Sequence, residues 1–366
     1  MSPKIIMNGL SFLLYFSGLI HLLIHIRRRV FRRYGIYILS YHHVIERCDS
    51  DRLGHDVTVK HFEEQLHFVK NQFDVVSLEQ ALGLLAGGSL NRDCVVITFD
   101  DGYQDNYRLA FPILCRSKIP ATVFLITGLI GSNHVPWYDE CREYLKAFAT
   151  TKFAPIRQTD DPILVQIQKI LSSRGKIDTK VERATDFLKT VNHRRRQEVL
   201  QLMRSSFKGT HRNKRRFRMM NWDQVREMAC HGVTFGSHTV THPVLTRMGA
   251  HEAERQLTIS KQSLEEKLAT PCDAFAFPNG NFDAGIIEIL KRGGYRSACT
   301  QTFGANEAGC NVFRLKRIGV GNIPHYTLAA KLSGFFTPIF SARNQWRKWH
   351  VSPLTPVSFQ GQERQS

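Results

Sequence analysis

The sequence lacks several features that would assign it quickly to a class. It has no CxxC pair and no visible internal repeat, although its 366 residues include 8 cysteines. Several cysteines lie in apolar runs, such as Cys94 before Val95 and Val96, which is typical of buried free thiols in a reducing compartment. The even count leaves disulfides open. The amino terminus also lacks the basic start and small-residue cleavage site of a secretory signal.

Acidic residues are scarce relative to basic ones. The 50 lysines and arginines outnumber the 32 aspartates and glutamates, and the formal net charge is +18. A positive field of this size suits nucleic acid, an anionic membrane surface or an acidic glycan, and charge alone does not choose among them. No aromatic recognition motif or DNA-binding helix pattern accompanies the charge, which argues against nucleic acid as a partner.

Charged residues are also absent from the first long apolar run, Ile5–Ile26, and about 20 such residues suffice to cross a bilayer. We predict an uncleaved membrane anchor in residues 1–34. The alternatives are a buried core helix or a segment that enters one leaflet. Five arginines follow the run, at positions 27–29, 32 and 33, whereas Lys4 alone precedes it. By the positive-inside rule, this bias predicts that the rest of the chain lies on the cytoplasmic face of a bacterial inner membrane.

Beyond the anchor, strand-like and helix-like segments alternate, which predicts an α/β fold with a parallel sheet or barrel. The predicted strands cover residues 37–41, 95–99, 121–126, 233–236, 275–277, 296–300 and 313–315. Between residues 136 and 218 the sequence is polar, basic and helical in pattern, and we interpret this segment as a helical insertion in the barrel. Residues 331–366 form a basic, aromatic tail that suits either a membrane interface or a solvated helix packed on the barrel.

Two adjacent carboxylates, Asp100 and Asp101, follow the predicted strand 95–99, and Gly102 permits a tight turn after them. Adjacent residues at a strand end point in different directions, so that one can bind a metal while the other accepts a proton. A turn with two solvated acids is the ordinary alternative for an isolated motif of this kind.

A second group of chemically useful residues is the pair His238 and His242. In a continuous strand these imidazoles would lie about 13 Å apart, from a rise of roughly 3.3 Å per residue, which is too far to share one ion. A helix is disfavoured because Thr239, Val240 and Thr241 are β-branched, and because a proline follows His242. We therefore expect a strand end and a tight loop that brings the two rings together.

Together, one carboxylate and two imidazoles form a ligand set that leaves positions open for water and substrate on a zinc-like ion. The second carboxylate is then free to act as a general base while water attacks an acyl bond.

Both motifs resemble those of the polysaccharide deacetylases (NodB-homology domain, carbohydrate esterase family 4). The run Thr98–Gly102 matches the family's first signature, and His238–His242 matches the second, written His-Ser/Thr-x-x-His. The resemblance implies a distorted (β/α) barrel of the NodB-homology type over residues 35–330, with its site at the carboxyl ends of the strands. It also implies a divalent ion, with zinc expected, and a substrate that is an N-acylated amino sugar in a polysaccharide or lipid-linked glycan.

By the same resemblance Asp100 is the catalytic base, and Asp101, His238 and His242 are the metal ligands. The third family motif is altered here: Ala276 replaces its arginine and Asn279 its aromatic residue. The backbone N–H of Asn279 still suits an oxyanion, because that role requires no particular side chain. The nearby arginines, Arg314 and Arg317, are candidates to replace the missing one, with surface positions favoured for both.

The family's general acid is a late histidine, for which His325 is the candidate. His42 competes with it, because a subgroup of the family opens with a similar Tyr-His pair. A core or supporting position is the alternative for each histidine. Trp137 begins a stretch that resembles the substrate-side loop of that subgroup, where it either stacks on a sugar or anchors the packing. The altered third motif also keeps open a catalytically inactive, glycan-binding descendant of the fold.

Overall fold

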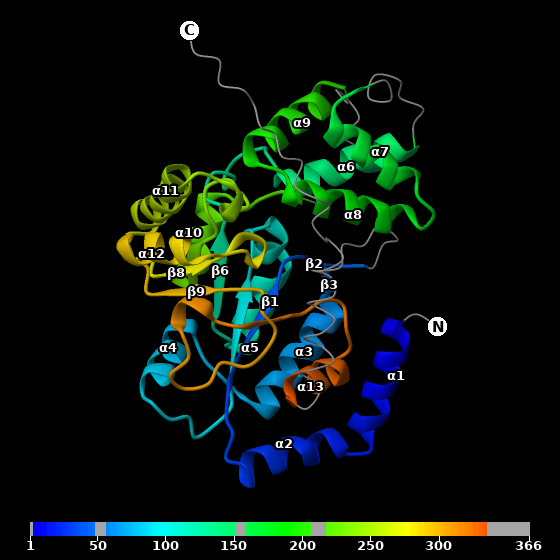
Figure 1. Cartoon of the computed structure of the whole chain (residues 1–366). Coiled ribbons are helices and arrows are strands. Elements are labelled where there is room, and N and C mark those ends of the chain that lie inside the picture. The colour runs from blue at the N-terminus through cyan, green and yellow to red at the C-terminus, as the bar shows by residue number, and fades with distance from the viewer. Residues whose placement is uncertain (1–2, 48–55, 151–158, 207–216, 335–366) are drawn as a thin grey trace.

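The computed structural model describes residues 3–47, 56–150, 159–206 and 217–334, and the statements below concern these residues. Their central feature is a parallel sheet of eight strands, shown in Figure 1. In chain order its strands are β1 (Ile36–Tyr41), β4 (Asp74–Val75), β5 (Cys94–Phe99), β6 (Ala121–Leu125), β7 (Val233–Ser237), β8 (Ala274–Ala276), β9 (Ser297–Cys299) and β10 (Arg317–Gly319). A separate pair consists of β2 (Val44–Ile45) and β3 (Val57–Thr58).

The sheet closes into a distorted barrel. Its strands follow one another in the order β10-β1-β5-β6-β7-β8-β9, with β4 on the outer side of β5. An isolated parallel bridge from Cys299 at the end of β9 to Leu315, just before β10, joins the two ends of this order. Since all strands are parallel, their carboxyl ends meet at one rim. The predicted α/β barrel is thereby confirmed.

The strands are apolar on both faces because helices cover the barrel outside. All six residues of β1 and of β5 are buried, as expected for strands between a packed interior and a helical layer. The helices are α1 (Pro3–Phe16), α2 (Leu19–Arg29), α3 (Val59–Gln72), α4 (Leu78–Ala86), α5 (Phe111–Ser117), α6 (Trp137–Thr150), α7 (Pro162–Ser172), α8 (Ile177–Thr190), α9 (His193–Ser206), α10 (Trp222–Cys230), α11 (Ala250–Leu268), α12 (Ala284–Arg292) and α13 (His325–Leu332).

The last predicted strand was misplaced. Residues 312–314 form a 3-10 turn, Val312–Arg314, and the strand begins only at Arg317. Asn311 caps this turn by accepting a hydrogen bond from the Phe313 N–H (2.9 Å), so the side chain of Asn311 stabilises the turn in place of extended backbone. The displacement matters because it brings Arg317, rather than Phe313, into the sheet.

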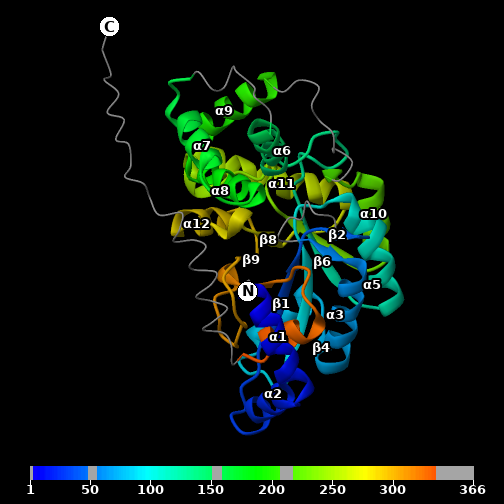
Figure 2. The ribbon, with the colours of Figure 1, turned by 90° about the vertical axis from the view of Figure 1, so that its right-hand side faces the viewer.

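Helices α6–α9 make up the described part of the insertion predicted for residues 136–218. They share a hydrophobic cluster of their own, which includes Leu145, Leu188 and Val199 and is distinct from the clusters of the barrel. Figures 1 and 2 both show these helices gathered at one end of the molecule, with α2 near the other end. The insertion therefore forms a cap with its own core.

The apolar run Ile5–Ile26, predicted as part of a membrane anchor, does not form one continuous helix. Gly18 adopts a left-handed φ of 79°, and the chain forms α1 and α2 with a bend of 70° between them. Within the described residues no single helix is long and apolar enough to cross a membrane, and this bent pair meets the requirement by length and composition only. Ile20 and Ile24 of α2 are buried, and α1 packs on α13.

Two of the five arginines after the apolar run have a structural role. Arg27 and Arg28 both pair with the buried carboxylate of Asp93, at 2.5 Å each, and Asp93 also accepts a hydrogen bond from the Gly35 N–H (2.9 Å). These contacts fix the end of α2 at the start of β5. Arg29, Arg32 and Arg33 are the exposed members of the group.

Other predictions fall partly outside the described residues. Seven cysteines within the described ranges are free, as the sequence predicted, whereas Cys48 lies outside them. Most of the predicted tail 331–366 also lies outside, because the description ends at residue 334.

Candidate metal and active site

Asp100 and Asp101 lie directly after β5, at the rim where the strands end. Asp101 has a left-handed φ of 74° and Gly102 follows with φ 88°. A Cβ on Gly102 would lie 2.5 Å from Cδ2 of Leu125, so both the conformation and the space at this position require glycine. The turn separates the two carboxylates in direction, as predicted from their adjacency at a strand end.

The two histidines come together through a tight loop after β7. His238 follows the strand at once, and Thr239 and His242 have φ values of 71° and 55°. A β-branched residue seldom adopts a positive φ, and here Oγ1 of Thr239 accepts a hydrogen bond from the His242 N–H (2.9 Å). The ring centroids of His238 and His242 lie 4.8 Å apart, which confirms the predicted bend.

Asp101, His238 and His242 form a buried triad whose ligand atoms lie within 4.8 Å of one another. Oδ1 of Asp101 is 3.6 Å from Nε2 of His238 and 3.7 Å from Nε2 of His242. Two ligand atoms at about 2.1 Å from a tetrahedral ion lie roughly 3.4 Å apart, so the spacing suits one ion. Nδ1 of His238 lies 2.6 Å from the Ala276 carbonyl, which leaves Nε2 as the ligand atom.

The electrostatics of the triad also fit a cation. Oδ1 of Asp101 is buried with no hydrogen-bond partner. Burial, together with the neighbouring charge of Asp100, raises the pKa of the Asp101 carboxyl to about 8. Burial lowers the pKa of His238 and of His242, so both imidazoles are neutral, as metal ligands must be. A divalent ion would offset the cost of burying the Asp101 carboxylate.

Asp100 is paired with an arginine that the sequence prediction placed on the surface. Arg317, from β10, is only 1% exposed and donates to both oxygens of Asp100, at 2.7 and 2.8 Å. Gln301 also donates to Oδ2 (3.2 Å). The preference for a surface position was therefore wrong for Arg317, because closure of the barrel places β10 beside β1 and turns this side chain inward. Arg314 lies over the ring of Phe282 instead.

This pairing keeps Asp100 ionised. Burial by itself raises the pKa of the carboxyl, but Arg317, His238 and His42 outweigh it and hold the pKa below its usual value. Two adjacent carboxyls thus shift in opposite directions, since Asp101 has no such partner. A pair with divergent pKa values is typical of sites in which the two groups have different tasks.

The two candidate general acids lie in different environments. Nε2 of His42 is 3.8 Å from Oδ2 of Asp100, and 22% of its side chain is exposed. The His325 ring instead contacts the rings of Tyr15 and Phe68 and lies 3.9 Å from Glu64. Of the two candidates, the structure brings His42 close to Asp100, whereas His325 lies beside Glu64.

Asn279 lies in a short turn, Pro278–Gly280, directly after β8 and the Ala276 carbonyl that contacts His238. It has φ 57°, and its Nδ2 is buried without a hydrogen-bond partner. The next residue, Gly280, leaves no room for a Cβ, which would lie 2.6 Å from Cβ of Gln301. Since Gln301 contacts Asp100, this turn borders the site.

Sequence reasoning missed two contributors to the site. Gln301 and Ser40 both approach Oδ2 of Asp100, at 3.2 and 3.4 Å. Neither belongs to a recognisable motif, and no sequence signal distinguishes them from other polar residues. Their position after β9 and within β1 becomes informative only once the strand order is known.

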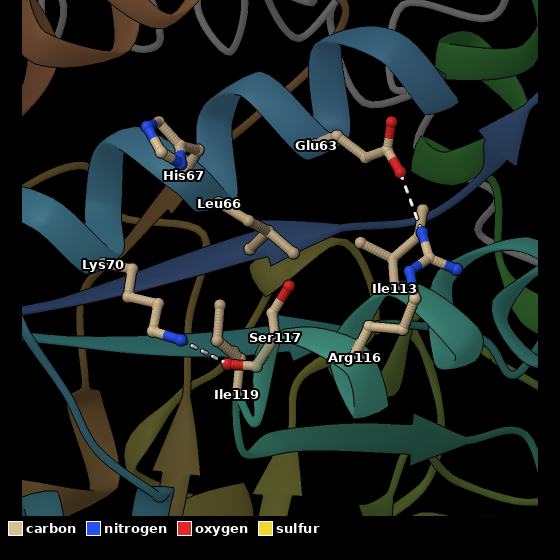
Figure 3. A pocket seen from close by; sticks show the side chains of 8 residues that line it. All are labelled: Glu63, Leu66, His67, Lys70, Ile113, Arg116, Ser117 and Ile119. Atoms are coloured by element: carbon tan, nitrogen blue, oxygen red, sulfur yellow. Dashed lines mark hydrogen bonds and ion pairs between the residues drawn. The ribbon is translucent and has the colours of Figure 1, made fainter.

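Two hollows lie apart from the triad. One, of about 380 Å³, separates α3 from α5, and Figure 3 shows its charged side chains engaged locally: Arg116 pairs with Glu63 (3.0 Å) and Lys70 donates to the Ser117 carbonyl (2.8 Å). The other, also about 380 Å³, lies between the cap and the barrel, where Trp137 and Thr241 contribute to its wall. None of the three triad residues lines either hollow.

Comparison with known proteins agrees with this geometry. The family model described as polysaccharide deacetylase matches residues 87–156 and 183–298. A putative polysaccharide deacetylase, YxkH of Bacillus subtilis, is 20% identical over 285 residues, which cover 77% of this chain and 70% of that protein. The poly-beta-1,6-N-acetyl-D-glucosamine N-deacetylase of Staphylococcus aureus is 34% identical over 82 residues, covering 22% of this chain and 28% of the relative.

Two solved structures share the fold. The deacetylase PplD of Streptococcus pyogenes, in complex with acetate, is 20% identical, with 81% of this chain and 97% of that chain covered and a TM-score of 0.54. IcaB from Ammonifex degensii is 21% identical, with 82% and 98% covered and a TM-score of 0.55. At these identities the likeness shows the barrel fold alone.

The closed parallel barrel with a buried Asp-His-His triad at its rim defines a hydrolase of carbon–nitrogen bonds other than peptide bonds. The family match covers half of the sequence. The chain belongs to the polysaccharide deacetylase family.

Proposed function

We propose that this enzyme removes N-acyl groups, with acetyl as the principal one, from amino sugars of a polysaccharide or a lipid-linked glycan. The proposal includes zinc as the ion and residues 35–330 as the catalytic domain, with the cap (residues 136–218) inserted in it. The buried triad beside an ionised Asp100 carries the proposal. Support for the substrate class comes from the family and from the names of the relatives.

A divalent ion on the triad would polarise the acyl carbonyl and lower the pKa of a coordinated water from about 15.7 towards 7. Asp100 accepts the proton of the attacking water, because it is ionised and is not one of the three ligands. Arg317 holds this carboxylate in a bidentate pair, which fixes its orientation. The backbone N–H of Asn279 is proposed to stabilise the oxyanion.

In place of His325 we propose His42 as the residue that delivers a proton to the leaving amine. Burial lowers the pKa of His42 to about 4, so its imidazole is neutral before the reaction. The pKa of Asp100 lies lower still, so a proton accepted there passes to His42 and then to the amine, which is more basic than either. The side chain of His42 is partly exposed beside the buried Asp100, so a substrate can reach it.

The inactive, glycan-binding alternative rested on the missing arginine of the third motif and on the uncertain general acid. Arg317 supplies a guanidinium to Asp100 from another strand, which removes the first objection, and the proposal of His42 as the acid answers the second. Glycan binding alone would not require an ionised carboxylate beside the triad, whereas hydrolysis does.

The decisive assay measures acetate release from a panel of N-acetylated oligosaccharides and lipid-linked amino sugars, with and without a chelator and with zinc restored. Release that stops on chelation and returns with zinc supports the proposal. Glycan binding without acetate release by the zinc-loaded enzyme, on every member of the panel, contradicts it.

We further propose that α1 and α2 attach the enzyme to the cytoplasmic face of a bacterial inner membrane. Large apolar side chains on this pair are exposed, including Ile6 (54%), Leu13 (66%) and Phe16 (62%). Within the described residues, Val165 and Leu202 are the exposed large apolar side chains beyond residue 31. The exposed Arg29, Arg32 and Arg33 suit anionic headgroups.

Sidedness is tested by carboxyl-terminal fusions of the full chain. A fluorescent fusion protein that folds, with an inactive alkaline phosphatase fusion, supports a cytoplasmic catalytic domain. Strong phosphatase activity with a dark fluorescent fusion would place the enzyme outside the cytoplasm.

A further inference from the structure

The first turn of α6 contacts the metal triad directly. The cap begins with Trp137, Tyr138 and Asp139, all buried, and these residues meet the loops that carry Asp101 and His242. The sequence interpretation gave Trp137 a role in sugar stacking or packing. Trp137 is buried in the hydrophobic cluster of the cap, which agrees with the packing alternative, and it also contacts a loop of the site.

Tyr138 packs against one of the three ligands. Its ring lies against the ring of His242, with centroids 4.8 Å apart. His242 Nε2 in turn lies 3.7 Å from Oδ1 of Asp101, so the Tyr138 ring packs on an imidazole of the triad itself.

The direction of the hydrogen bond from Tyr138 follows from its neighbours. Tyr103, in the turn after Asp101, donates its only O–H to Asp139 (2.5 Å), and its oxygen lies 3.1 Å from the Tyr138 hydroxyl. Arg142 also donates to Asp139 (3.1 Å). Since the proton of Tyr103 goes to Asp139, the Tyr138 hydroxyl donates to the Tyr103 oxygen, which ties α6 to the turn that follows Asp101.

Trp137 holds the other loop. Its indole N–H donates to the His242 carbonyl (2.9 Å), and the buried guanidinium of Arg196, from α9, lies over the indole ring at 4.6 Å. A backbone bond at His242 matters because this residue has φ 55°, a conformation that the loop must maintain. Through Trp137 the packing of the cap extends to a metal ligand.

We propose that Tyr138 and Trp137 are positioning residues through which the cap sets the geometry and affinity of the metal centre. The inference rests on the proposed function, because it requires an ion on the triad. The cap has a hydrophobic core of its own and could fold without contacting the metal site. The inference gives it a second role, which is to hold the metal ligands in place. Groups that orient metal ligands typically alter metal affinity about 10- to 100-fold when they are removed.

The test is a zinc titration of metal-free, full-length protein in competition with a chromophoric chelator. Trp137→Phe should bind zinc about 10- to 100-fold more weakly than the wild type, because it removes the donor to the His242 carbonyl. Tyr138→Phe keeps the ring packed on His242 and should show a smaller loss. Tyr144→Phe is the control, because Tyr144 is buried on the same helix but donates to Glu140 (2.9 Å). The visible spectrum of the cobalt-loaded protein should change in Trp137→Phe and not in the control.

Thermal unfolding of the metal-free forms separates positioning from folding, since Trp137→Phe should still unfold cooperatively without metal. Wild-type zinc affinity and an unchanged cobalt spectrum in Trp137→Phe would overturn the inference while leaving the proposed function intact. A wild-type protein that binds no zinc or cobalt would overturn both.

If Trp137→Phe does not fold, hydrogen exchange on the wild type gives the answer. Zinc should slow amide exchange in the first turn of α6 more than in α7 (Pro162–Ser172), which belongs to the same cap but has no described contact with the ligands. Equal effects of zinc on α6 and α7 would contradict the inference.

Discussion

At the carboxyl ends of β5 and β7, two carboxylates and two imidazoles are buried, whereas α1 and α2 leave large apolar side chains exposed at the amino-terminal end of the molecule. Both arrangements are costly in water. Buried ionisable groups lose hydration, and exposed apolar groups order the water around them. Each region is stable only with a suitable partner, and the chemistry of its side chains indicates which one.

The rim of the barrel compensates part of its own cost. Arg317 neutralises Asp100, while Asp101 is left with neutral histidines and a raised pKa. A bound cation would supply the positive charge that Asp101 and the two neutral histidines lack. The helix pair has no comparable compensation, and its proposed partner is a lipid surface. The predictions below test the first region, then its support, then the second region.

The largest effect is expected from the ligands. His238→Ala or His242→Ala should lose both the metal and more than about 99% of the activity, because two remaining donors hold an ion poorly. Metal analysis of the purified variant and an acetate assay check this. His251→Ala, an exposed histidine on α11, is the control. Full activity and metal content in either ligand variant would refute the assignment.

Asp100→Asn should keep its metal and lose turnover by about 10²- to 10⁴-fold, because it removes the proton acceptor and no ligand. The same metal analysis and assay distinguish the two effects. Loss of the ion in this variant would show that the roles of Asp100 and Asp101 are not divided as proposed.

The two candidate acids are separated by a matched pair. His42→Asn should reduce turnover by about 10²-fold, the lower end of the range for general acid catalysis, whereas His325→Asn should have turnover close to that of the wild type. Steady-state kinetics on an N-acetylated oligosaccharide checks both. The reverse pattern would restore His325 as the acid.

Arg317→Met should cost roughly 3–5 kcal/mol of unfolding free energy, because it leaves Asp100 buried without its partner. Denaturant unfolding at pH 7 measures this, with Arg314→Met as the neighbouring control. The pKa of Asp100 is lower in the folded protein than its unfolded value of about 3.9. Its pairing with Arg317 therefore stabilises the fold above that pH and less as the pH falls through the folded pKa, so the difference between variant and wild type should shrink in acid.

The smallest effect on catalysis is expected at the helix pair. Leu13→Glu combined with Phe16→Glu should move the enzyme from the membrane fraction to the soluble fraction, and its activity on a soluble oligosaccharide should change less than about twofold. Sedimentation with anionic lipid vesicles measures the first effect. Undiminished vesicle binding would contradict the membrane role of these side chains.

Much of the site followed from local sequence, because each motif lies in one short loop. Strand propensity, an adjacent pair of acids and two histidines separated by β-branched residues were enough to predict one carboxylate and two imidazoles around an ion, and the bend between the histidines. The choice of Asp101 as the ligand came from the family resemblance. Arg317 was not predictable in the same way, because its contact with Asp100 depends on how β10 closes the barrel beside β1. A contact that depends on the pairing of strands far apart in the chain leaves no signal in the local sequence.

The bend in the amino-terminal helix pair was not predicted, for a different reason. Its composition fits a span, and hydropathy does not distinguish a straight helix from two helices bent at Gly18. The Ser17-Gly18 pair is a turn signal that could have indicated the break. Tyr138 and Trp137 were visible as aromatic residues, but their contacts with the ligands depend on how the cap packs on the barrel.

The central claim is that a metal held by Asp101, His238 and His242 enables Asp100 to promote deacylation. The most direct measurement follows zinc content and acetate release together as the wild-type enzyme is stripped with a chelator and reloaded, on an N-acetylated amino-sugar oligomer. The account predicts one zinc per chain at full activity, with activity falling and returning in proportion to zinc. Acetate release that continues at full rate from protein shown to contain no divalent metal would contradict it.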